Sequence, residues 1–275
     1  MVIDQSTQLD KNGYLLLKNF LSVAEKKIII NAFNKILSKY LKIGKNSSNL
    51  NFNNISLHKK LMNFRKKNPK KFGDFYDELK LNASLRSIFY SRKFINMFSK
   101  ILKIKKEFLV LNGFVVRLDA PFDDRNILDW HMDGPSFEQT HPYYNAGACM
   151  IPLTNNSIKN GTVKFIPCSN KSKINPENIR WIKKSKLSSG NITVPITKKE
   201  KKLVKDLDTS FGDVGIFHMN LKHRSGKNIS KKFRLTYICR FHDTSKKLNV
   251  GKEWYIYNKT NSPFLNKNSK YFRPY

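Results

Sequence analysis

From Glu107 onward the sequence consists largely of short runs rich in β-branched and aromatic residues, each bounded by Gly, Pro, Asn or Ser. Runs of this length between such residues are typical of β-strands joined by turns. They are FLVLNGFVVRL (108–118), AGACMIPLT (146–154), GTVKFIP (161–167), NITVPI (191–196), GDVGIFHM (212–219) and FRLTYICRF (233–241). Many short strands in succession predict an antiparallel barrel or jelly roll for this part of the chain.

The first hundred residues show a different pattern, in which apolar residues recur at helical spacing. Residues 13–20 (GYLLLKNF) predict a short strand. Ser22 and Glu25 then form an S-x-x-E capping box, which predicts a helix from there to about Leu41. Shorter helical patterns follow over residues 55–103. We therefore expect an α+β chain in which residues 1–275 form a single domain, with a helix-rich part (1–106), a β-core (107–243) and a tail (244–275).

The formal net charge of +32 comes mainly from lysines scattered along the chain. Only about ten of the 52 basic residues are arginine, and asparagine is abundant, a profile that A/T-rich coding DNA produces without selection for any partner. The charge could also serve a nucleic acid, an anionic membrane surface or an acidic substrate. No zinc-finger spacing or RNP-like strand accompanies the lysines, so we expect nucleic acid to bind only through non-specific charge attraction.

The cysteines and the N-terminal residues bear on the compartment. Cys149, Cys168 and Cys239 are an odd number without a C-x-x-C pair, which favours a reducing environment. The N-terminal residues carry neither a basic start nor an apolar stretch, and no window approaches the roughly 18 apolar residues of a membrane span. We therefore expect a cytoplasmic protein without a membrane span.

The segment Asp129-Trp130-His131-Met132-Asp133 contains a candidate metal site. On a strand, residues i and i+2 point to the same face, so His131 and Asp133 would project together into the barrel. The segment 212–228 offers His218 and His223 as a third ligand. Two histidines and one carboxylate on one face of an octahedral Fe(II) leave three positions open, as non-haem oxygenases require. An H-x-D pattern alone also fits a strand histidine that merely bonds a carboxylate.

The order of motifs around His131 resembles that of the phytanoyl-CoA dioxygenase family of Fe(II)/2-oxoglutarate oxygenases. WHMDG is followed by AGACMIPLT, NGTVKFIPCSNKS, GDVGIFHMNLKHRSGKNIS and KKFRLTY, and the resemblance runs from about residue 10 to about residue 243. It implies a double-stranded β-helix (jelly roll) with N-terminal and flanking helices. Cys168 and Asn170 depart from the family, which usually has glycine and histidine in this turn; glycine would permit a positive φ.

The resemblance also implies roles for five residues. His131, Asp133 and His223 would be the iron ligands, and His223 is preferred to His218 because an S-x-x-N continuation follows it. Arg234, eleven residues after His223, would pair with the far carboxylate of 2-oxoglutarate, and Ser225 would help to hold that carboxylate. An arginine suits this task because its planar fork donates two parallel hydrogen bonds to a buried carboxylate.

The resemblance implies a dioxygenase that uses Fe(II), 2-oxoglutarate and O2, and that hydroxylates a small molecule with release of succinate and CO2. Halogenating relatives replace the ligand carboxylate with a small residue, so Asp133 favours hydroxylation. Two alternatives stay open: an oxygenase directed at nucleic acid or protein, and a non-catalytic jelly-roll binding protein.

An acidic window lies between Asp119 and Glu138, where six carboxylates accompany only Arg125. It is either a polar loop that leads to the metal strand or an acidic mouth that recognises amines or hydroxyls.

Overall fold

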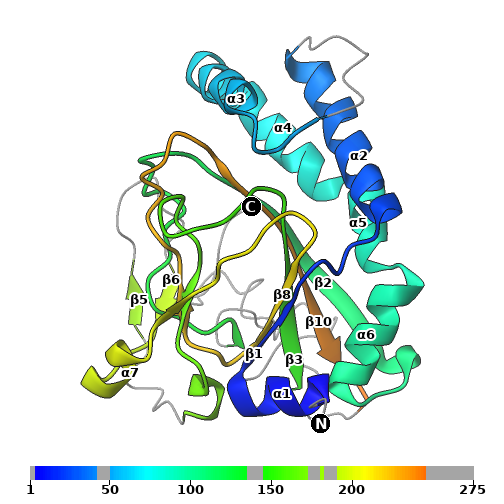
Figure 1. Ribbon diagram of the computed structural model, residues 1–275, viewed down its shortest axis with the longest axis vertical. Helices are drawn as coiled ribbons and strands as arrows, with labels where there is room; N and C mark the ends of the chain where they lie inside the picture. The colour runs from blue at the N-terminus through cyan, green and yellow to red at the C-terminus, as the bar shows by residue number, and fades with distance from the viewer. Residues whose placement is uncertain (1–3, 42–49, 135–144, 173–179, 183–190, 246–275) are drawn as a thin grey trace, which may run out of the picture.

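The computed structural model describes residues 4–41, 50–134, 145–172, 180–182 and 191–245. Within them the main sheet is antiparallel, with its strands in the order β1-β8-β3-β10-β2 (Figure 1). These strands are β1 (Tyr14–Leu17), β2 (Leu109–Asp119), β3 (Ala146–Pro152), β8 (Val214–His218) and β10 (Arg234–Asp243). Neighbouring strands come from distant parts of the sequence, so long-range pairing builds this sheet.

A second, smaller antiparallel sheet contains strands in the order β7-β4-β9. Its strands are β4 (Lys164–Phe165), β7 (Lys205–Asp206) and β9 (His223–Arg224). Phe165 of β4 packs against Phe217 of β8, with ring centroids 5.3 Å apart, so an apolar cluster joins the two sheets. A further pair is formed by β5 (Arg180–Ile182) and β6 (Asn191–Thr193).

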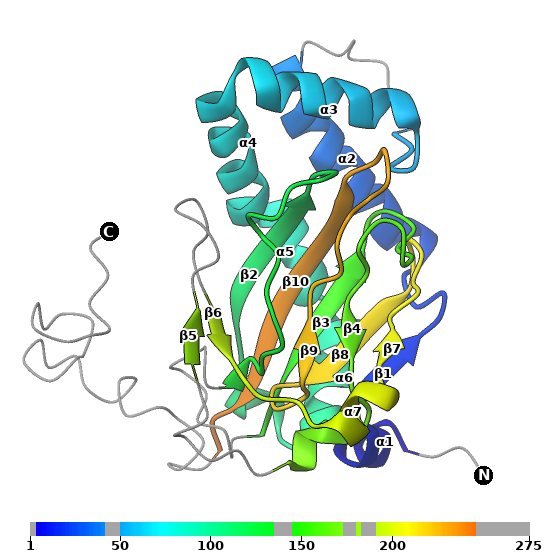
Figure 2. The ribbon, with the colours of Figure 1, turned by 90° about the vertical axis from the view of Figure 1, so that its left-hand side faces the viewer.

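Most helices lie on one side of the main sheet (Figures 1 and 2). They are α1 (Gln5–Asn12), α2 (Val23–Leu41), α3 (Ile55–Lys67), α4 (Pro69–Leu81), α5 (Ala83–Phe89) and α6 (Arg92–Leu102); α7 (Lys198–Lys202) lies apart from them, and the 3-10 turns are Lys106–Phe108 and Ser169–Lys171. The predicted capping box before α2 is present: Glu25 N–H donates to Ser22 Oγ (3.2 Å) and Ser22 N–H donates to Glu25 Oε2 (2.7 Å). The predicted mixture of helices and antiparallel strands is confirmed.

The side chains of β10 alternate between two environments. Leu235, Tyr237, Cys239 and Phe241 are buried in the large apolar core that the helices share with the sheet. The intervening positions face the other way and are largely polar; they are Arg234, Thr236, Ile238, Arg240 and His242. A strand alternates its faces in this manner because its side-chain period is two. The polar face of β10 is therefore available to build a site on the side of the sheet away from the helices.

A bulge in β2 sets which of its residues lie on this polar side. The pairing of β10 with β2 shifts between Ile238 and Arg240, and Gly113 has a φ of +56°. Glycine suits this position because an L side chain there would be strained and would meet Arg240. The extra residue places Asn112 opposite Arg240 and lets Asn112 Oδ1 reach His242 Nε2 at 2.6 Å.

His58 of α3 hydrogen-bonds to two backbone groups outside its helix. Its Nε2 lies 2.8 Å from Phe52 O, and Phe233 N–H donates to its Nδ1 at 3.1 Å. The ring is fully buried, and burial lowers the pKa of His58 to about 4. The folded protein therefore keeps this imidazole neutral at a pH at which the unfolded chain protonates it.

We expect this difference to make stability depend on pH. Between pH 7 and pH 5 the unfolded chain takes up a proton at His58 and the folded chain does not, so the free energy of unfolding should fall by about 2 kcal/mol from this group. Urea unfolding of the metal-free protein at both pH values measures the fall. His58→Gln should be less stable at pH 7 but should lose less stability on acidification. An equal loss in both proteins would contradict the prediction.

None of the described helices is both long and apolar enough to cross a bilayer. Most of the expected tail lies outside the described residues, which end at residue 245.

Candidate metal centre

His131, Asp133 and His223 meet at the start of β9. The backbones of His131 and His223 pair directly, with each N–H donating to the other's carbonyl oxygen at 2.9 Å. Candidate ligand atoms of the three side chains all lie within 4.8 Å of one another. Asp133 Oδ1 is 3.7 Å from His131 Nε2 and 3.8 Å from His223 Nε2. A single isolated bridge between His131 and His223, and not a pair of strands, thus brings together side chains that are at least 90 residues apart in the sequence.

Backbone carbonyl groups orient both imidazole rings. His131 Nδ1 lies 2.6 Å from Asp129 O, and His223 Nδ1 lies 2.9 Å from Leu221 O. A carbonyl oxygen only accepts hydrogen bonds, so each Nδ1 carries the proton and each Nε2 offers its lone pair. Burial lowers the pKa of His131 to about 3, which keeps that ring neutral. With the proton on each Nδ1, the two Nε2 atoms beside Asp133 are the ones that can bind a metal ion.

Arg240 holds the second oxygen of Asp133. Its Nε and Nη2 lie 3.1 Å and 3.0 Å from Asp133 Oδ2, and its Nη1 donates to Gly113 O at 3.0 Å. Burial alone would raise the pKa of Asp133, but the guanidinium of Arg240 holds it below the usual value. The carboxylate is therefore ionised, with Oδ2 engaged and Oδ1 directed at the histidines. This contact was not predicted from the sequence. The alternation along β10 does place Arg240 on the same face as Arg234, which is the one sequence signal for it.

This donor set fits Fe(II). Two imidazole nitrogens and one carboxylate oxygen are the ligands of the facial triad that leaves open positions on non-haem Fe(II). Among the described residues no other group of three histidine, cysteine or carboxylate side chains comes this close together. His218 lies elsewhere, at the end of β8, where its Nδ1 accepts a hydrogen bond from Asn220 N–H at 3.1 Å. The geometry thus brings His223 to His131 and Asp133, and leaves His218 outside the cluster.

Arg240→Gln should weaken iron binding by about 10–100-fold, the usual effect of removing a group that orients a ligand. The substitution releases Asp133 Oδ2, so the carboxylate can rotate and loses its charged partner. Competition with a chelator of known affinity measures the change. Arg224→Gln is a matched control, because Arg224 is adjacent to His223 but stacks over Trp130, 5.8 Å from the ring centroid. Equal iron affinity in the Arg240→Gln variant and the wild type would refute the prediction.

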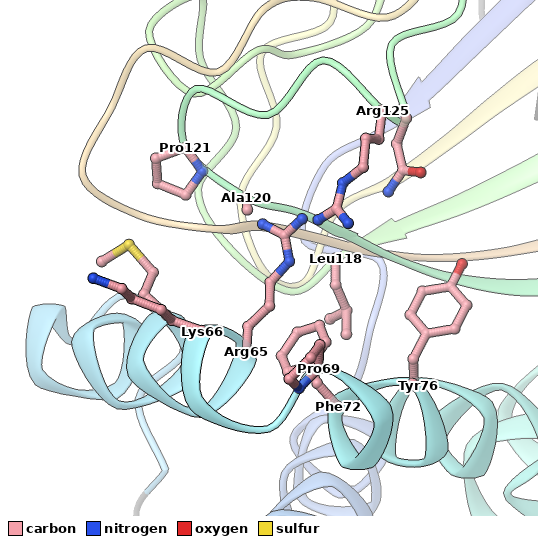
Figure 3. A pocket seen from close by; sticks show the side chains of 12 residues that line it. Arg65, Lys66, Pro69, Phe72, Tyr76, Leu118, Ala120, Pro121 and Arg125 are labelled. Carbon is pink, nitrogen blue, oxygen red and sulfur yellow. The ribbon is translucent and has the colours of Figure 1, made fainter. Parts of the chain in front are cut away.

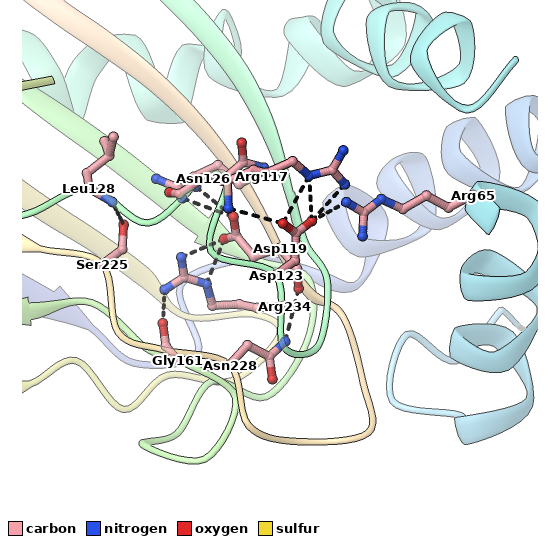
Figure 4. Close-up of polar contacts among 11 residues, drawn as sticks. Arg65, Arg117, Asp119, Asp123, Asn126, Leu128, Gly161, Ser225, Asn228 and Arg234 are labelled. Carbon is pink, nitrogen blue, oxygen red and sulfur yellow. Dashed lines mark hydrogen bonds and ion pairs between the residues drawn. The ribbon is translucent and has the colours of Figure 1, made fainter. Parts of the chain in front are cut away.

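Arg234 is buried where β10 begins (Figure 4). Its Nε and Nη2 donate to Asp119 Oδ2 at 3.0 Å and 2.6 Å, and its Nη1 donates to Gly161 O. Arg117 Nη2 donates to the other oxygen of Asp119 at 2.9 Å. Burial alone would raise the pKa of Asp119, but the two arginines hold it below the usual value. Two guanidinium groups share one carboxylate. The three side chains together therefore carry one net positive charge, which could pair with one further carboxylate.

Ser225 lies close to this arginine pair and is also buried. Its Oγ accepts a hydrogen bond from Leu128 N–H at 3.2 Å, and its own N–H donates to Leu128 O at 3.0 Å. These bonds join the segment after β9 to the segment before His131. Within the described residues the hydroxyl makes no hydrogen bond to Arg234.

The acidic window does not form an acidic mouth among the described residues. Asp119 is neutralised by Arg117 and Arg234, and Asp133 by Arg240. Asp123 likewise pairs with arginines, namely Arg65 and Arg125, and the exposed Asp124 lies 3.6 Å from Lys227. The sequence suggested a net negative segment because most of the arginines that neutralise it lie far away along the chain. Glu138 lies outside the described residues.

The turn that departs from the family pattern keeps the backbone conformation expected of glycine. Cys168 has a φ of +62°, and its N–H donates to Asn12 O at 2.8 Å. Asn170 Nδ2 donates to Asp10 O at 3.0 Å, so the turn is tied to α1. A cysteine in the left-handed region is strained, but its side chain is exposed and meets no obstacle in the core.

Comparisons with known proteins agree with this geometry. The family model described as phytanoyl-CoA dioxygenase (PhyH) matches residues 9–236. No curated protein sequence matches significantly. Among solved structures, the chain resembles EctD from S. alaskensis with 2-oxoglutarate and 5-hydroxyectoine (TM-score 0.57, 15% identity, 90% of this chain and 79% of that chain).

Two further structures show the same fold. One is the α-ketoglutarate-dependent epimerase SnoN from nogalamycin biosynthesis (TM-score 0.57, 13% identity, 87% of this chain and 79% of that chain). The other is the non-haem monooxygenase ThoJ (TM-score 0.56, 15% identity, 87% of this chain and 77% of that chain). The family match spans most of the chain and includes all three candidate ligands. The chain therefore belongs to the phytanoyl-CoA dioxygenase family, whose members are Fe(II)- and 2-oxoglutarate-dependent oxygenases that act on small molecules.

Proposed function

We propose that this enzyme hydroxylates a C–H bond of a small molecule within a double-stranded β-helix core. In this proposal His131, Asp133 and His223 bind Fe(II), while Arg234, assisted by Ser225, binds the far carboxylate of 2-oxoglutarate. The convergence of two imidazole nitrogens and one carboxylate oxygen carries the proposal. Bound Fe(II) would supply the oxidising chemistry with O2 and 2-oxoglutarate, which leaves as succinate and CO2.

The residues around the metal would control orientation and charge. Asp129 O and Leu221 O hold both rings so that their Nε2 atoms face the ion. Arg240 leaves Asp133 a single oxygen for the metal, which preserves an open coordination position. The excess positive charge of Arg117 and Arg234 over Asp119 would attract the dicarboxylate cosubstrate and fix its far end.

The carboxylate of Asp133 supports hydroxylation over halogenation. A halogenase needs a vacant coordination position for the halide, whereas Asp133, held by Arg240, would supply a carboxylate ligand there when Fe(II) is bound. The EctD structure with 5-hydroxyectoine shows that this fold can accommodate a hydroxylated small molecule. The free cysteines Cys149, Cys168 and Cys239 suit a reducing compartment, and we propose the cytoplasm.

Succinate formation tests the proposed chemistry without a known substrate. Many oxygenases of this kind decarboxylate 2-oxoglutarate slowly without substrate, so Fe(II), 2-oxoglutarate and O2 should together yield succinate. Omission of Fe(II), or the His223→Ala substitution, should abolish it. A protein that binds iron stoichiometrically but forms no succinate, with or without candidate substrates, would instead be a binding protein. Oxygen incorporation into a product in chloride buffer, without chlorination, would support hydroxylation.

The lysine-rich surface leads to a separate prediction about nucleic acid. Duplex DNA should bind independently of sequence, and the binding should vanish at moderate salt, because each lysine–phosphate contact releases a counterion. Fluorescence anisotropy with two unrelated duplexes over a salt series measures this. Tight, sequence-selective binding at physiological ionic strength would favour an oxygenase that acts on nucleic acid.

A further inference from the structure

A cavity of about 730 Å³ lies between the helices α3 and α4 and the loop that follows β2 (Figure 3). Phe72 and Tyr76 of α4 form part of its wall, together with Leu118 of β2. Leu118 belongs to the apolar core on the helix side of the sheet, whereas Arg117 and Asp119 point to the opposite side. None of the three candidate metal ligands lines the cavity, so it is distinct from the metal centre.

Positive charge dominates the rim of this cavity. Arg65 and Lys66 of α3 and Arg125 of the loop line it, and Figure 3 shows the two guanidinium groups approaching each other from opposite sides. Asp123 accepts hydrogen bonds from both arginines, with Arg125 Nη2 at 2.8 Å from Asp123 Oδ2. Two guanidinium groups therefore share one carboxylate, and Lys66 adds a further positive charge to the rim. Lys66 has no ion-pair partner within the described residues, so the rim retains about two positive charges.

Base composition does not account for these arginines. The chain contains ten arginines among 52 basic residues, and four of the ten gather around the segment 119–126. They are Arg65, Arg117, Arg125 and Arg234. A/T-rich coding DNA disfavours arginine and supplies lysine instead, so a concentration of arginine at one place indicates a requirement for its planar, multidentate donors.

Gly73 supplies a second, independent observation. It lies within α4 and lines the cavity, yet a Cβ added there would meet no atom within 4 Å. Glycine inside a helix is destabilising relative to alanine, and neither a positive φ nor close packing requires it here. Gly73 is exposed, so its lack of a side chain leaves the mouth of the cavity open beside Phe72.

We infer that this cavity binds a small organic anion that carries an apolar, flat portion. The acid group would be held at the rim by Lys66, Arg65 and Arg125. The two arginines already donate hydrogen bonds to the carboxylate of Asp123, so their geometry suits an acid group. The apolar portion would lie in the space above Gly73, against the ring of Phe72. Such a site combines the few polar groups and the apolar walls that are typical of ligand pockets.

A matched pair of dyes tests the inference. 8-Anilinonaphthalene-1-sulfonate is an aromatic anion, and N-phenyl-1-naphthylamine is its uncharged counterpart; both become fluorescent in apolar surroundings. The iron-loaded protein with saturating 2-oxoglutarate should bind the sulfonate about tenfold more tightly than the amine, since charge-assisted hydrogen bonds contribute only to the anion. Inorganic phosphate, which supplies an acid group alone, should compete weakly, and added salt should reduce the difference between the dyes.

Substitutions locate the binding. Arg125→Gln and Lys66→Ala should each weaken sulfonate binding by about threefold to tenfold, while Lys71→Ala on the exposed face of α4 should leave it unchanged. Gly73→Leu should fill the space and weaken both dyes by at least about tenfold without unfolding the protein, because the added Cβ meets nothing. Gly73→Ala should raise the melting temperature.

Three outcomes would overturn the inference. The first is equal affinity for the two dyes, which would remove the preference for an anion. The second is unchanged sulfonate binding in both Gly73→Leu and Arg125→Gln, which would place the dye elsewhere. The third is displacement of the dye when 2-oxoglutarate is titrated into iron-loaded protein that initially lacks it, which would place the dye at the metal centre. None of these outcomes depends on oxygenase activity, so they leave the proposed function untouched.

Discussion

Asp133→Ala and His131→Ala should each reduce bound iron from about one Fe(II) per chain to a trace. Each substitution removes one of three protein ligands, and the remaining pair cannot compete with water for the ion. The three side chains are buried and close to one another but lie outside the apolar core, so folding should survive. Iron content after anaerobic loading and gel filtration measures the effect, and circular dichroism monitors folding.

His223 and His218 provide a sharp control for this prediction. His223→Ala should lose iron as completely as His131→Ala, since its Nε2 lies 3.8 Å from Asp133 Oδ1. His218→Ala should retain iron, because His218 bonds Asn220 N–H outside the cluster. Retention of iron by His223→Ala with loss by His218→Ala would move the third ligand, and unchanged iron in Asp133→Ala would refute the triad.

Arg234→Lys should raise the KM for 2-oxoglutarate by at least about 100-fold while iron binding survives. Lysine supplies a point charge without the two-pronged donor geometry, and breaking a buried charge pair costs about 3–5 kcal/mol. The variant also loses bonds to Asp119 and Gly161, so its thermal stability should fall. Succinate release as a function of 2-oxoglutarate concentration, together with iron content, measures the effect.

Comparison variants distinguish a cosubstrate role of Arg234 from a merely structural one. Ser225→Ala removes a neutral hydroxyl and should weaken the binding of 2-oxoglutarate by only about 1–2 kcal/mol. Arg117→Lys disturbs the same Asp119 carboxylate, so an equal loss of stability with a smaller rise in KM would assign the cosubstrate to Arg234. Unchanged 2-oxoglutarate dependence in Arg234→Lys would direct attention to Arg117 or Arg240 instead.

Local sequence patterns indicated the type of several elements, and the family resemblance indicated the candidate ligands. Ser22 and Glu25 bond each other's backbone whatever the rest of the chain does, so a capping box can be recognised without a structure. The alternation in FRLTYICRF likewise separates the core face of β10 from the face that carries Arg234, because the period of a strand is two. The sequence also contains the motif spacing on which the family resemblance rests, and that resemblance assigned roles to His131, Asp133, His223 and Arg234.

Only the tertiary structure decided which charges neutralise one another. The paired residues are far apart in the sequence: Asp133 is 107 residues from Arg240, Asp119 is 115 from Arg234, and Asp123 is 58 from Arg65. A count of charges within the segment 119–138 therefore includes these carboxylates but not these arginines. The register between β2 and β10 places Asp119 opposite Arg234, whereas the other two pairs depend on how the segment after β2 packs against β10 and α3. The cavity beside Gly73 likewise depends on how α3 and α4 pack against the loop after β2. Its walls come from all of these elements, so no single stretch of sequence could predict it.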